Sequence, residues 1–345
     1  MKKPYVIAEM GVNFYDTARI MKISPLDAAK LYIDKAAEVG IDCAKFQSYK
    51  AKTIVSKNSP AYWDTNKEPT KSQYELFLKY DSFGKAEYRE LCDYTHSKGM
   101  DFTSTPFDYD SADYLADMVD FYKISSSDLS NLPFIRYIGS KGKPVYMSVG
   151  AAYLSEVDEA VRSLEDSGCR DIVLLHCVLS YPTLPQNANL KVIETLKKDF
   201  PNTRVGFSDH VAPDDAMITL ATAYLLGADV IEKHFTLDKS LQGNDHYHAG
   251  TPDDFKKAIS NFKWIDMVLG SAKKTVLDCE TVPRREARRS LVLTKDKKAG
   301  EIINAEDLMP KRPGTGISPE HVKIVVGRKV VKDLKEDTIL TWDMI

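Results

Sequence analysis

VGFSDH, from Val205 to His210, and DVIEKHF, from Asp229 to Phe235, are two apolar runs that carry His210 and His234 at their ends. Each run has the length of one strand, and a helix-like segment lies between them. In a (β/α)8 barrel the carboxyl ends of all strands open into one catalytic mouth. Imidazoles from two neighbouring strands would meet there. The two runs therefore predict a barrel with a divalent-metal site held by His210 and His234.

Six further runs of β-branched or other apolar residues precede these two. They are YVIAE (Tyr5 to Glu9), CAKFQ (Cys43 to Gln47), DFTSTP (Asp101 to Pro106), FYKIS (Phe121 to Ser125), PVYMSVG (Pro144 to Gly150) and IVLLHC (Ile172 to Cys177). Eight strands with helical patterns between them predict an α/β fold, in which a parallel sheet closes into a TIM barrel. The alternative is an open doubly wound sheet. That fold would want a GxGxxG turn after an early strand, and the sequence has none.

Helical periodicity is clear in two of the intervening segments. Residues 25–40, PLDAAKLYIDKAAEVG, repeat apolar residues at three- and four-residue steps. In LSEVDEAVRSLEDSG, residues 154–168, we expect the helix to start at Ser155 and to end at Gly168. The connection over residues 49–82 is too long for an ordinary barrel loop. It is expected either to cover the mouth as a lid or to pack as a surface loop with its own small cluster.

The pattern changes after Leu277, which gives three predicted regions. Residues 1–277 would form the barrel, and the polar, basic residues 278–288 would form a linker. Residues 289–345 are expected to form a compact β-rich module of about sixty residues, with a short helix at PEHVKIVVG. A module of this size is only marginally stable alone, so we expect it to dock against a barrel.

Composition is typical of a soluble globular protein, with 43% hydrophobic and 28% charged residues. The net charge of −3 gives no support for a nucleic-acid partner. The five cysteines are odd in number and form no CxxC pair, which indicates reduced thiols and a cytoplasmic protein. The amino-terminal MKKPYVIAEMG has only a short apolar run interrupted by Glu9. We therefore expect neither a signal peptide nor a membrane span there.

Polar side chains stand at the predicted strand ends, where plain scaffolding would carry bulky apolar residues. Lys45 and Lys123 are each embedded in an apolar run. A lysine in such a place is usually paired with an anion. Two lysines beside Ser and Thr hydroxyls therefore indicate a phosphate or carboxylate pocket. The alternative is a set of internal salt bridges with Glu9 or Asp128.

The loop after the last predicted strand, QGNDHYHAG, adds three polar candidates. Asp245 is expected to contact a polyol or a metal-bound water. His246 and His248 are interpreted as residues of the loop surface. In the preceding strand, Asp209 could orient an imidazole by hydrogen bonding.

Eight motifs occur along the chain in a fixed order. They are IAEMGVN (residues 7–13), KFQ (45–47), FTSTPF (102–107), YKISSSD (122–128), LLHC with YPT (174–183), GFSDH, EKHFT and KRPGTG (311–316). In this order they resemble the sialic acid synthase family, also called N-acetylneuraminate or nonulosonate synthases, over almost the whole chain. The carboxyl-terminal module resembles the antifreeze-like SAF domain of that family, a β-clip fold.

This resemblance implies an enzyme that condenses phosphoenolpyruvate with N-acetylmannosamine or a related 2-acetamido sugar and releases phosphate. The related acceptors include the 6-phosphate of N-acetylmannosamine and the diacetamido-trideoxy sugars that lead to legionaminic or pseudaminic acid. The resemblance also implies a divalent cation, typically Mn2+, with Mg2+ or Co2+ as alternatives. It further implies a domain-swapped homodimer, in which each tail module covers the barrel of the other subunit.

The resemblance assigns roles position by position. His210 and His234 would hold the metal, and Glu9 and Asp128 would be the acid/base and sugar-contacting carboxylates. The residues that grip phosphoenolpyruvate would be Lys45, Thr105, Lys123, Ser126, Ser148 and Ser208. The residues that contact the sugar would be Gln47, Phe107, Tyr181, Asp245 and, from the partner subunit, Arg312.

Four positions depart from the family pattern. Asp128 stands where glutamate is usual, and Phe14 where histidine is frequent. Val149 replaces a threonine, and Leu179 occupies a place often filled by a polar residue near the phosphate. These changes concern the identity of the sugar more than the reaction.

Two other functions fit the sequence less well. An aldol-type barrel enzyme that joins phosphoenolpyruvate to a phosphorylated aldose would lack the tail module and would need further Arg or Lys for its second phosphate. A binding protein without catalysis would not need both a metal pair and an anion pocket.

Overall fold

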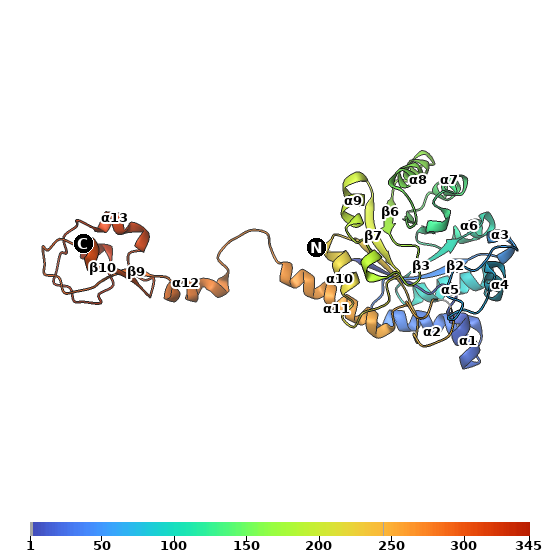
Figure 1. Cartoon of the computed structure of the whole chain (residues 1–345), viewed down its shortest axis with the longest axis horizontal. Helices are drawn as coiled ribbons and strands as arrows, with labels where there is room; N and C mark the ends of the chain where they lie inside the picture. Colours follow the sequence, from blue (N-terminus) through green and yellow to red (C-terminus); the bar gives the residue numbers. More distant parts are fainter. Residues whose placement is uncertain (1–2, 244) are drawn as a thin grey trace. The chain divides into compact units, whose positions relative to one another are not determined.

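The computed structural model describes residues 3–243 and 245–345, so Asn244 in the QGNDHYHAG loop lies outside the described residues. The chain forms two compact units, Met1–Gly270 and Ser271–Ile345 (Figure 1). None of the helices in the described ranges is long and apolar enough to cross a membrane.

The first unit contains the eight expected strands, each parallel to its neighbours. All of them begin and end close to their predicted bounds, because apolar runs of strand length are the clearest signal in this sequence. The strands are β1 (Tyr5–Glu9), β2 (Cys43–Ser48), β3 (Asp101–Pro106), β4 (Tyr122–Ile124), β5 (Val145–Ser148), β6 (Ile172–His176), β7 (Arg204–Asp209) and β8 (Val230–His234).

The strands close into a barrel with one seam. Their order is β3-β2-β1-β8-β7-β6-β5-β4, so the ring meets itself between β3 and β4. There the amide of Asp120 donates to the Phe102 carbonyl at 2.9 Å, and Thr103 Oγ1 donates to the Phe121 carbonyl at 2.5 Å. Among the described residues the seam is thus closed by individual bonds, whereas the other neighbouring strands share a regular ladder.

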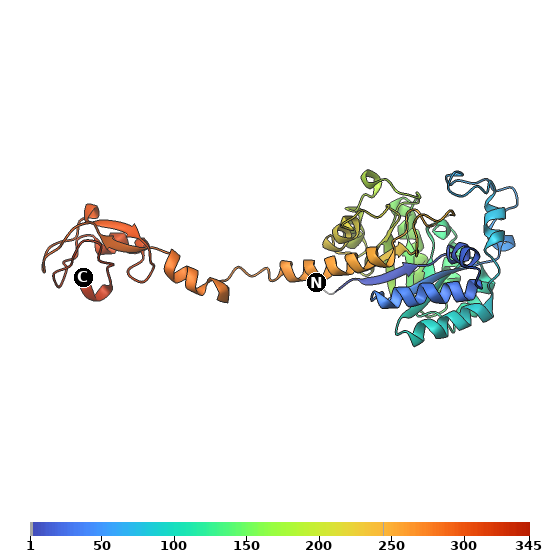
Figure 2. The same cartoon turned by 90° about the horizontal axis from the view of Figure 1, so that it is seen from below.

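The helices surround the strands (Figure 1 and Figure 2). They lie outside because successive side chains of a strand point to opposite faces, so that one face of each strand packs on helices and the other faces the barrel interior. The helices are α1 (Phe14–Met21), α2 (Pro25–Glu38), α3 (Ala51–Ile54), α4 (Gln73–Lys79), α5 (Lys85–Ser97), α6 (Tyr109–Leu115), α7 (Leu132–Gly139), α8 (Leu154–Asp166), α9 (Val192–Asp199), α10 (Ile218–Leu225) and α11 (Pro252–Leu269).

Helix α8 begins one residue before the predicted start. The amide of Tyr153 donates to Glu156 Oε2 at 2.7 Å, so Tyr153 is the capping position and Ser155 lies inside the first turn. This hydrogen bond between Glu156 and the backbone fixes the helix start, although serine is the residue usually preferred at the capping position. Gly168 follows the helix end with φ +97°, as the sequence predicted for a terminating glycine.

The barrel interior changes from apolar to polar along the strands. Its apolar layer consists of Ile7, Cys43, Phe121, Tyr146, Val173, Leu175 and Val230. Two residues further along β1, β2 and β8 stand Glu9, Lys45 and Glu232, which point to the same interior because the side-chain period of a strand is two. Glu9 is in register with both Lys45 and His234. The strand ends therefore carry a charged layer on top of an apolar floor.

The long connection over residues 49–82 has a small structure of its own. Helices α3 and α4 lie side by side (Figure 1). The indole of Trp63 donates to the carbonyls of Glu68 and Thr70, both at 3.1 Å. Glu68 is buried and accepts from the Thr70 amide and from Lys79 Nζ, both at 2.9 Å. We call residues 49–82 the mouth segment, since part of it also lines the cavity described below.

The second unit is the small β-rich module that the sequence predicted. Strand β9 (Ser290–Leu293) pairs antiparallel with β10 (Leu308–Lys311), and the short helix α13 (Val322–Val325) follows. Its core contains Leu291, Leu293, Ile303, Ile317, Val325, Val330, Leu334 and Leu340. The buried Asp307 pairs with Lys295 at 2.7 Å and Lys297 at 2.5 Å. The predicted linker, residues 278–288, is exposed throughout and carries helix α12 (Thr281–Ala287).

Candidate active site

A cavity of about 690 Å³ opens at the carboxyl ends of the barrel strands. All the site residues predicted in the barrel line it, because every strand delivers its last inward-facing side chains to this mouth. They are Glu9, Lys45, Gln47, Thr105, Phe107, Lys123, Ser126, Asp128, Ser148, Tyr181, Ser208, His210, His234 and Asp245. Arg312 lies in the second unit, directly after β10, and is exposed.

Two buried lysines form the cationic part of this cavity. Lys45 Nζ contacts Glu9 Oε2 and donates to Thr105 Oγ1 at 3.3 Å. Lys123 Nζ donates to Ser148 Oγ at 2.7 Å. The two lysines and the hydroxyls beside them come from four strands, β2 to β5, so they form one pocket across the seam of the barrel.

Internal salt bridges also form, but their partners are only partly those expected. Lys45 pairs with Glu9, whereas Lys123 pairs with Glu232 at 3.7 Å and not with Asp128. Glu232 Oε1 also lies 3.9 Å from Lys45 Nζ. The lysines of the predicted anion pocket are therefore also the cations of these salt bridges. The carboxylates occupy positions that an anionic ligand would take over.

Glu232 is a residue of the cavity wall that the sequence analysis did not single out. It is buried, lines the cavity and accepts a hydrogen bond from Ser208 Oγ at 2.9 Å. Its other carboxylate oxygen, Oε2, has no hydrogen-bond partner among the described residues. The signal was present, because Glu232 stands two residues before His234 in one strand and must share its face.

The two central carboxylates bind protons differently. Burial raises the pKa of Glu9 above its ordinary value, and the Glu232 charge adds to this effect while Lys45 opposes it. Burial also acts on Glu232, but Lys123 and Lys45 outweigh it and lower the pKa of that group. Two carboxyl groups with pKa values pushed apart are suited to different roles, one as a proton donor and one as a base.

His210 and His234 lie together, with ring centroids 5.6 Å apart. His210 Nδ1 donates to the Val178 carbonyl at 2.7 Å, which leaves its Nε2 electron pair free. Burial lowers the pKa of His210 to about 4 and that of His234 well below its ordinary value. Both imidazoles are therefore neutral, as a metal ligand must be.

The loop after β8 differs from its interpretation as a surface loop. His246 and His248 are both 0% exposed, because the loop folds back into the mouth. His246 Nδ1 lies 2.7 Å from Thr236 Oγ1, and its Nε2 lies 3.6 Å from Asp16. His248 instead joins His234 and Asp245, and the ligand atoms of these three residues all lie within 4.8 Å of one another.

These donors suit a divalent cation. His234 Nδ1 and both nitrogens of His248 are buried without a hydrogen-bond partner among the described residues, and Asp245 supplies carboxylate oxygens. Burial, with a contribution from Glu9, raises the pKa of Asp245 to about 7. A cation would bind the unbonded nitrogens and would offset the repulsion between the Asp245 and Glu9 carboxylates.

Asp209 does not orient a site histidine by hydrogen bonding. Its side chain pairs with Lys233 at 2.6 Å and accepts a hydrogen bond from the Val211 amide.

The rim of the cavity consists of small polar side chains and of the mouth segment. Ser126 Oγ lies 3.0 Å from Cys177 Sγ and accepts from the Gly150 amide at 3.0 Å. Asp128 accepts from Asn131 at 3.3 Å, and burial raises its pKa. The mouth segment adds a largely apolar and aromatic wall, consisting of Thr53, Ile54, Val55, Tyr62, Trp63, Asp64, Gln73, Leu76, Phe77 and Tyr80. The segment thus has its own packed cluster and also covers part of the mouth.

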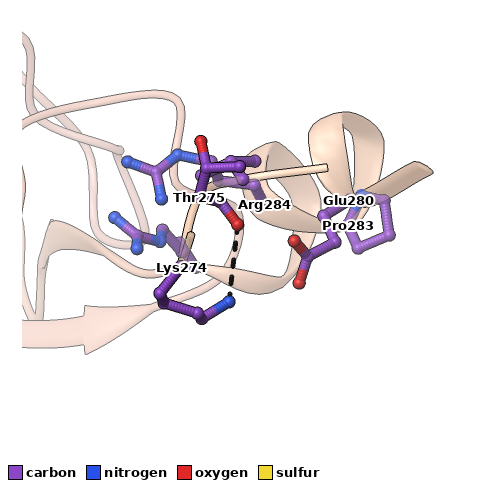
Figure 3. Close-up of a pocket in the computed structure, with 7 residues that line it drawn as sticks. Lys274, Thr275, Glu280, Pro283 and Arg284 are labelled. Carbon is purple, nitrogen blue, oxygen red and sulfur yellow. Dashed lines mark hydrogen bonds between the residues drawn. The ribbon is translucent and has the colours of Figure 1, made fainter. Parts of the chain in front are cut away.

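A second hollow lies in the second unit, next to helix α12 (Figure 3). Its volume is about 460 Å³, and it is lined by Lys274, Thr275, Val276, Glu280, Pro283, Arg284 and Arg288. All of these residues are exposed. Without a buried polar side chain it has the character of ordinary surface, so the chemistry of the chain is concentrated in the barrel mouth.

Comparison with known proteins identifies the family. The NeuB family matches residues 32–274, and the SAF domain matches residues 288–345. The chain belongs to the NeuB family. This confirms the resemblance drawn from the motifs and the arrangement of a TIM barrel with a SAF module.

The NeuB-family chain is similar to synthases with different products in their names. It is 37% identical over 346 residues to the N,N'-diacetyllegionaminic acid synthase of Campylobacter jejuni, covering 99% of both chains. It is 29% identical to the N-acetylneuraminate-9-phosphate synthase of Homo sapiens, covering 99% of this chain and 92% of that one. Among solved structures, the N-acetylneuraminic acid synthetase of Leptospira borgpetersenii matches with a TM-score of 0.69 and 31% identity, over 82% of this chain and 90% of the other.

Proposed function

We propose that this chain is a nonulosonic acid synthase that joins phosphoenolpyruvate to an unphosphorylated 2-acetamido sugar and releases phosphate. The main support is the polar layer of the barrel mouth. It brings two lysines, several hydroxyls, two unlike carboxyl groups and neutral imidazoles into one cavity. Each of these groups has a use in the reaction.

The lysine pocket would hold phosphoenolpyruvate. Lys45 and Lys123, with Thr105 and Ser148 beside them, offer charged donors and hydroxyls to phosphate and carboxylate oxygens. The ligand would replace Glu9 and Glu232 as the partners of the lysines. Ser126 and Ser208, which also line the cavity, would add hydroxyl contacts to the same ligand.

His210 and His234 would hold a divalent cation, with Mn2+ the best candidate and Mg2+ or Co2+ as alternatives. When bound, such a cation supplies a Lewis acid that polarises the aldehyde of the open-chain sugar. Gln47, Phe107, Tyr181, Asp128 and Asp245 would line the sugar site. Arg312 would reach the N-acyl group from the partner subunit of a domain-swapped homodimer, as the resemblance to the family implies.

The carbon–carbon bond would form between C3 of phosphoenolpyruvate and the aldehyde carbon of the sugar. Glu9, whose pKa is raised, is suited to give a proton to the aldehyde oxygen. The cationic centre left at C2 takes up water, and Glu232, whose pKa is lowered, is suited to accept the proton of that water. The bond between C2 and the phosphate oxygen then breaks, leaving the 2-keto acid and free phosphate.

The charges that this chain itself brings to the cavity favour a neutral acceptor. Its described lining includes the carboxyl groups of Glu9, Asp64, Asp128, Glu232 and Asp245, two lysines and no arginine. Arg312 of the partner subunit is assigned to the N-acyl group and so would not pair with a second phosphate. Both lysines are needed for phosphoenolpyruvate, so a second phosphate would meet carboxylates. The apolar wall of the mouth segment suits the methyl groups of an acetamido or deoxy sugar.

Phosphate release with a panel of acceptors tests this proposal. We expect turnover of phosphoenolpyruvate with N-acetylmannosamine or a 2,4-diacetamido-trideoxy sugar and Mn2+, and loss of turnover with a chelator. The 6-phosphate of N-acetylmannosamine should be a poorer acceptor by at least about tenfold, because it adds an unpaired dianion to an acidic wall. Preference for the 6-phosphate would contradict the assignment of a neutral acceptor. No release with any of these sugars would contradict the proposed reaction.

A further inference from the structure

His248 is fully buried, and no described neighbour forms a hydrogen bond with it. It lies on the loop after β8 and is 0% exposed. Neither ring nitrogen has a hydrogen-bond partner among the described residues. A buried imidazole in this state has lost the hydrogen bonds it had in water without gaining others, which is unfavourable. Such a side chain needs a ligand, or its place in the fold is unfavourable.

The surroundings of His248 indicate the kind of ligand. Asp245 Oδ1 lies 3.7 Å from His248 Nε2, and Asp245 Oδ2 lies 3.8 Å from His234 Nδ1. These distances are too long for hydrogen bonds. They are close to the spacing of about 3–4 Å between two ligand atoms of one transition-metal ion whose bonds are about 2.0–2.2 Å. The carboxylate therefore lies between two imidazoles at the spacing of a coordination sphere.

Aromatic side chains surround the His248 ring. A neutral imidazole whose nitrogens make no hydrogen bond has an electron pair available for a metal ion. The aromatic rings beside His248, Tyr181 and Tyr247, have centroids 5.4 and 5.0 Å away and fix its position without satisfying its nitrogens.

We propose that His248 is a metal ligand, which forms with His234 and Asp245 a group of two imidazoles and one carboxylate, to which His210 would add a third imidazole. The inference rests on the proposed function, because it enlarges the metal site that the reaction would use. It also names the class of cation. Imidazole-rich sites bind first-row transition metals in preference to Mg2+, which prefers oxygen ligands and keeps its waters. The site should therefore select Mn2+, Fe2+, Co2+ or Zn2+ over Mg2+.

Metal titration of the substrate-free protein tests the proposal without using activity. Mn2+ binding can be followed by the loss of the free Mn2+ signal in electron paramagnetic resonance, with Mg2+ as competitor. The variant His248→Phe keeps the ring volume between Tyr181 and Tyr247 but cannot coordinate. We expect its Mn2+ affinity to fall by at least about 10- to 100-fold, the range seen when groups that support a metal site are lost. In the wild type, a hundredfold excess of Mg2+ should leave most of the Mn2+ bound.

His246→Gln is the matched control, since His246 is equally buried in the same loop but bonds to Thr236. Its Mn2+ affinity should stay within about threefold of the wild type. Equal losses in both variants would show that the loop as a whole was damaged, and would overturn the assignment of His248. If His248→Phe does not fold, the smaller His248→Asn takes its place in the same titration.

The outcomes separate this inference from the proposed function. A His248→Phe variant that is folded and binds Mn2+ as tightly as the wild type would overturn the role of His248 alone. A wild type that binds no transition metal but releases phosphate in the presence of chelator would overturn the metal requirement of the proposed reaction as well. A wild type that binds Mn2+ through His248 but turns over none of the sugars would support the site and contradict the reaction.

Discussion

Glu9 and Glu232 lie in the same buried layer but differ in their affinity for protons. Glu232 faces both lysines, whereas Glu9 contacts Lys45 and Gln47. The net positive surroundings keep Glu232 ionised, and this carboxylate still has an unbonded oxygen. At the scale of single residues, the structure therefore supports a division of acid and base roles that sequence position alone does not give.

Replacing Glu232 tests this division. Glu232→Gln keeps the shape and the acceptor for Ser208 but removes the base, so phosphate release should slow by about 10²- to 10⁴-fold. Mn2+ binding in the absence of substrate should persist, because Glu232 is not among the three grouped ligands. Steady-state phosphate release and the Mn2+ titration measure the two effects. Unchanged turnover would remove Glu232 from the mechanism.

The residues that sequence reasoning found and missed differ in a simple way. Lys45, Lys123 and the two predicted metal histidines stand in or directly after apolar strands, where the alternation of side chains fixes their direction. Glu232 had the same signal through its spacing from His234. His248 had none, because a loop has no periodicity, and its burial depends on how the QGNDHYHAG segment folds back into the mouth.

At the scale of elements, the mouth segment is held by a buried carboxylate. Glu68 fixes Thr70 and Lys79 within the segment, and Trp63 bonds to the same turn. The Glu68→Gln variant should weaken this turn, since an amide cannot pair with Lys79. In the proposed function the wall it supports would face the sugar, whereas the pocket proposed for phosphoenolpyruvate is built on strands. We therefore expect KM for the sugar to rise by about 3- to 10-fold and KM for phosphoenolpyruvate to stay near its wild-type value.

Initial-rate kinetics with each substrate varied in turn, together with hydrogen exchange over residues 49–82, give the measurement. Glu75→Gln is a suitable control, because Glu75 lies on the same segment but is exposed. An equal rise in both KM values would show that the segment supports the whole cavity and not the sugar side alone. The length of this connection predicted either a lid or a surface loop with its own cluster. Its two short helices and its turn could not be predicted, because such short segments carry too little hydrophobic periodicity.

At the scale of the whole molecule, each unit has its own means of stability. The second unit has a small apolar core and relies on Asp307, a buried carboxylate between Lys295 and Lys297. Although burial would raise the pKa of Asp307, the two lysines outweigh it and hold the pKa far below the ordinary value. A pKa that is lower in the folded state stabilises the fold above the unfolded pKa of about 4, and this contribution is lost as the pH falls below that value.

Asp307→Asn should therefore destabilise the second unit at neutral pH and flatten its response to acid. We expect a loss of about 2–3 kcal/mol, less than for a fully enclosed pair because Lys295 is more than half exposed. Thermal unfolding at pH 7 and at pH 3 measures both effects. The difference between the variant and the wild type should shrink at the lower pH. A constant difference across this range would rule out the ion pair as its cause.

The order of elements and the two-unit division follow from sequence patterns, whereas the closure of the barrel does not. Eight apolar runs predicted eight strands, and the change after Leu277 predicted a separate module. The position of the seam depends on the lengths and the tilt of the strands. The sequence of β4 (Tyr122–Ile124) does not show that this strand is short, so the seam could not be predicted.

The seam between β3 and β4 also runs through the anion pocket. Lys45 and Thr105 stand on one side of it, and Lys123 and Ser148 stand on the other. A ligand that contacts both groups would bridge the junction that, among the described residues, lacks a regular ladder. If phosphoenolpyruvate binds there as proposed, it would hold the two open edges of the sheet together. Its binding should then stabilise the barrel against unfolding.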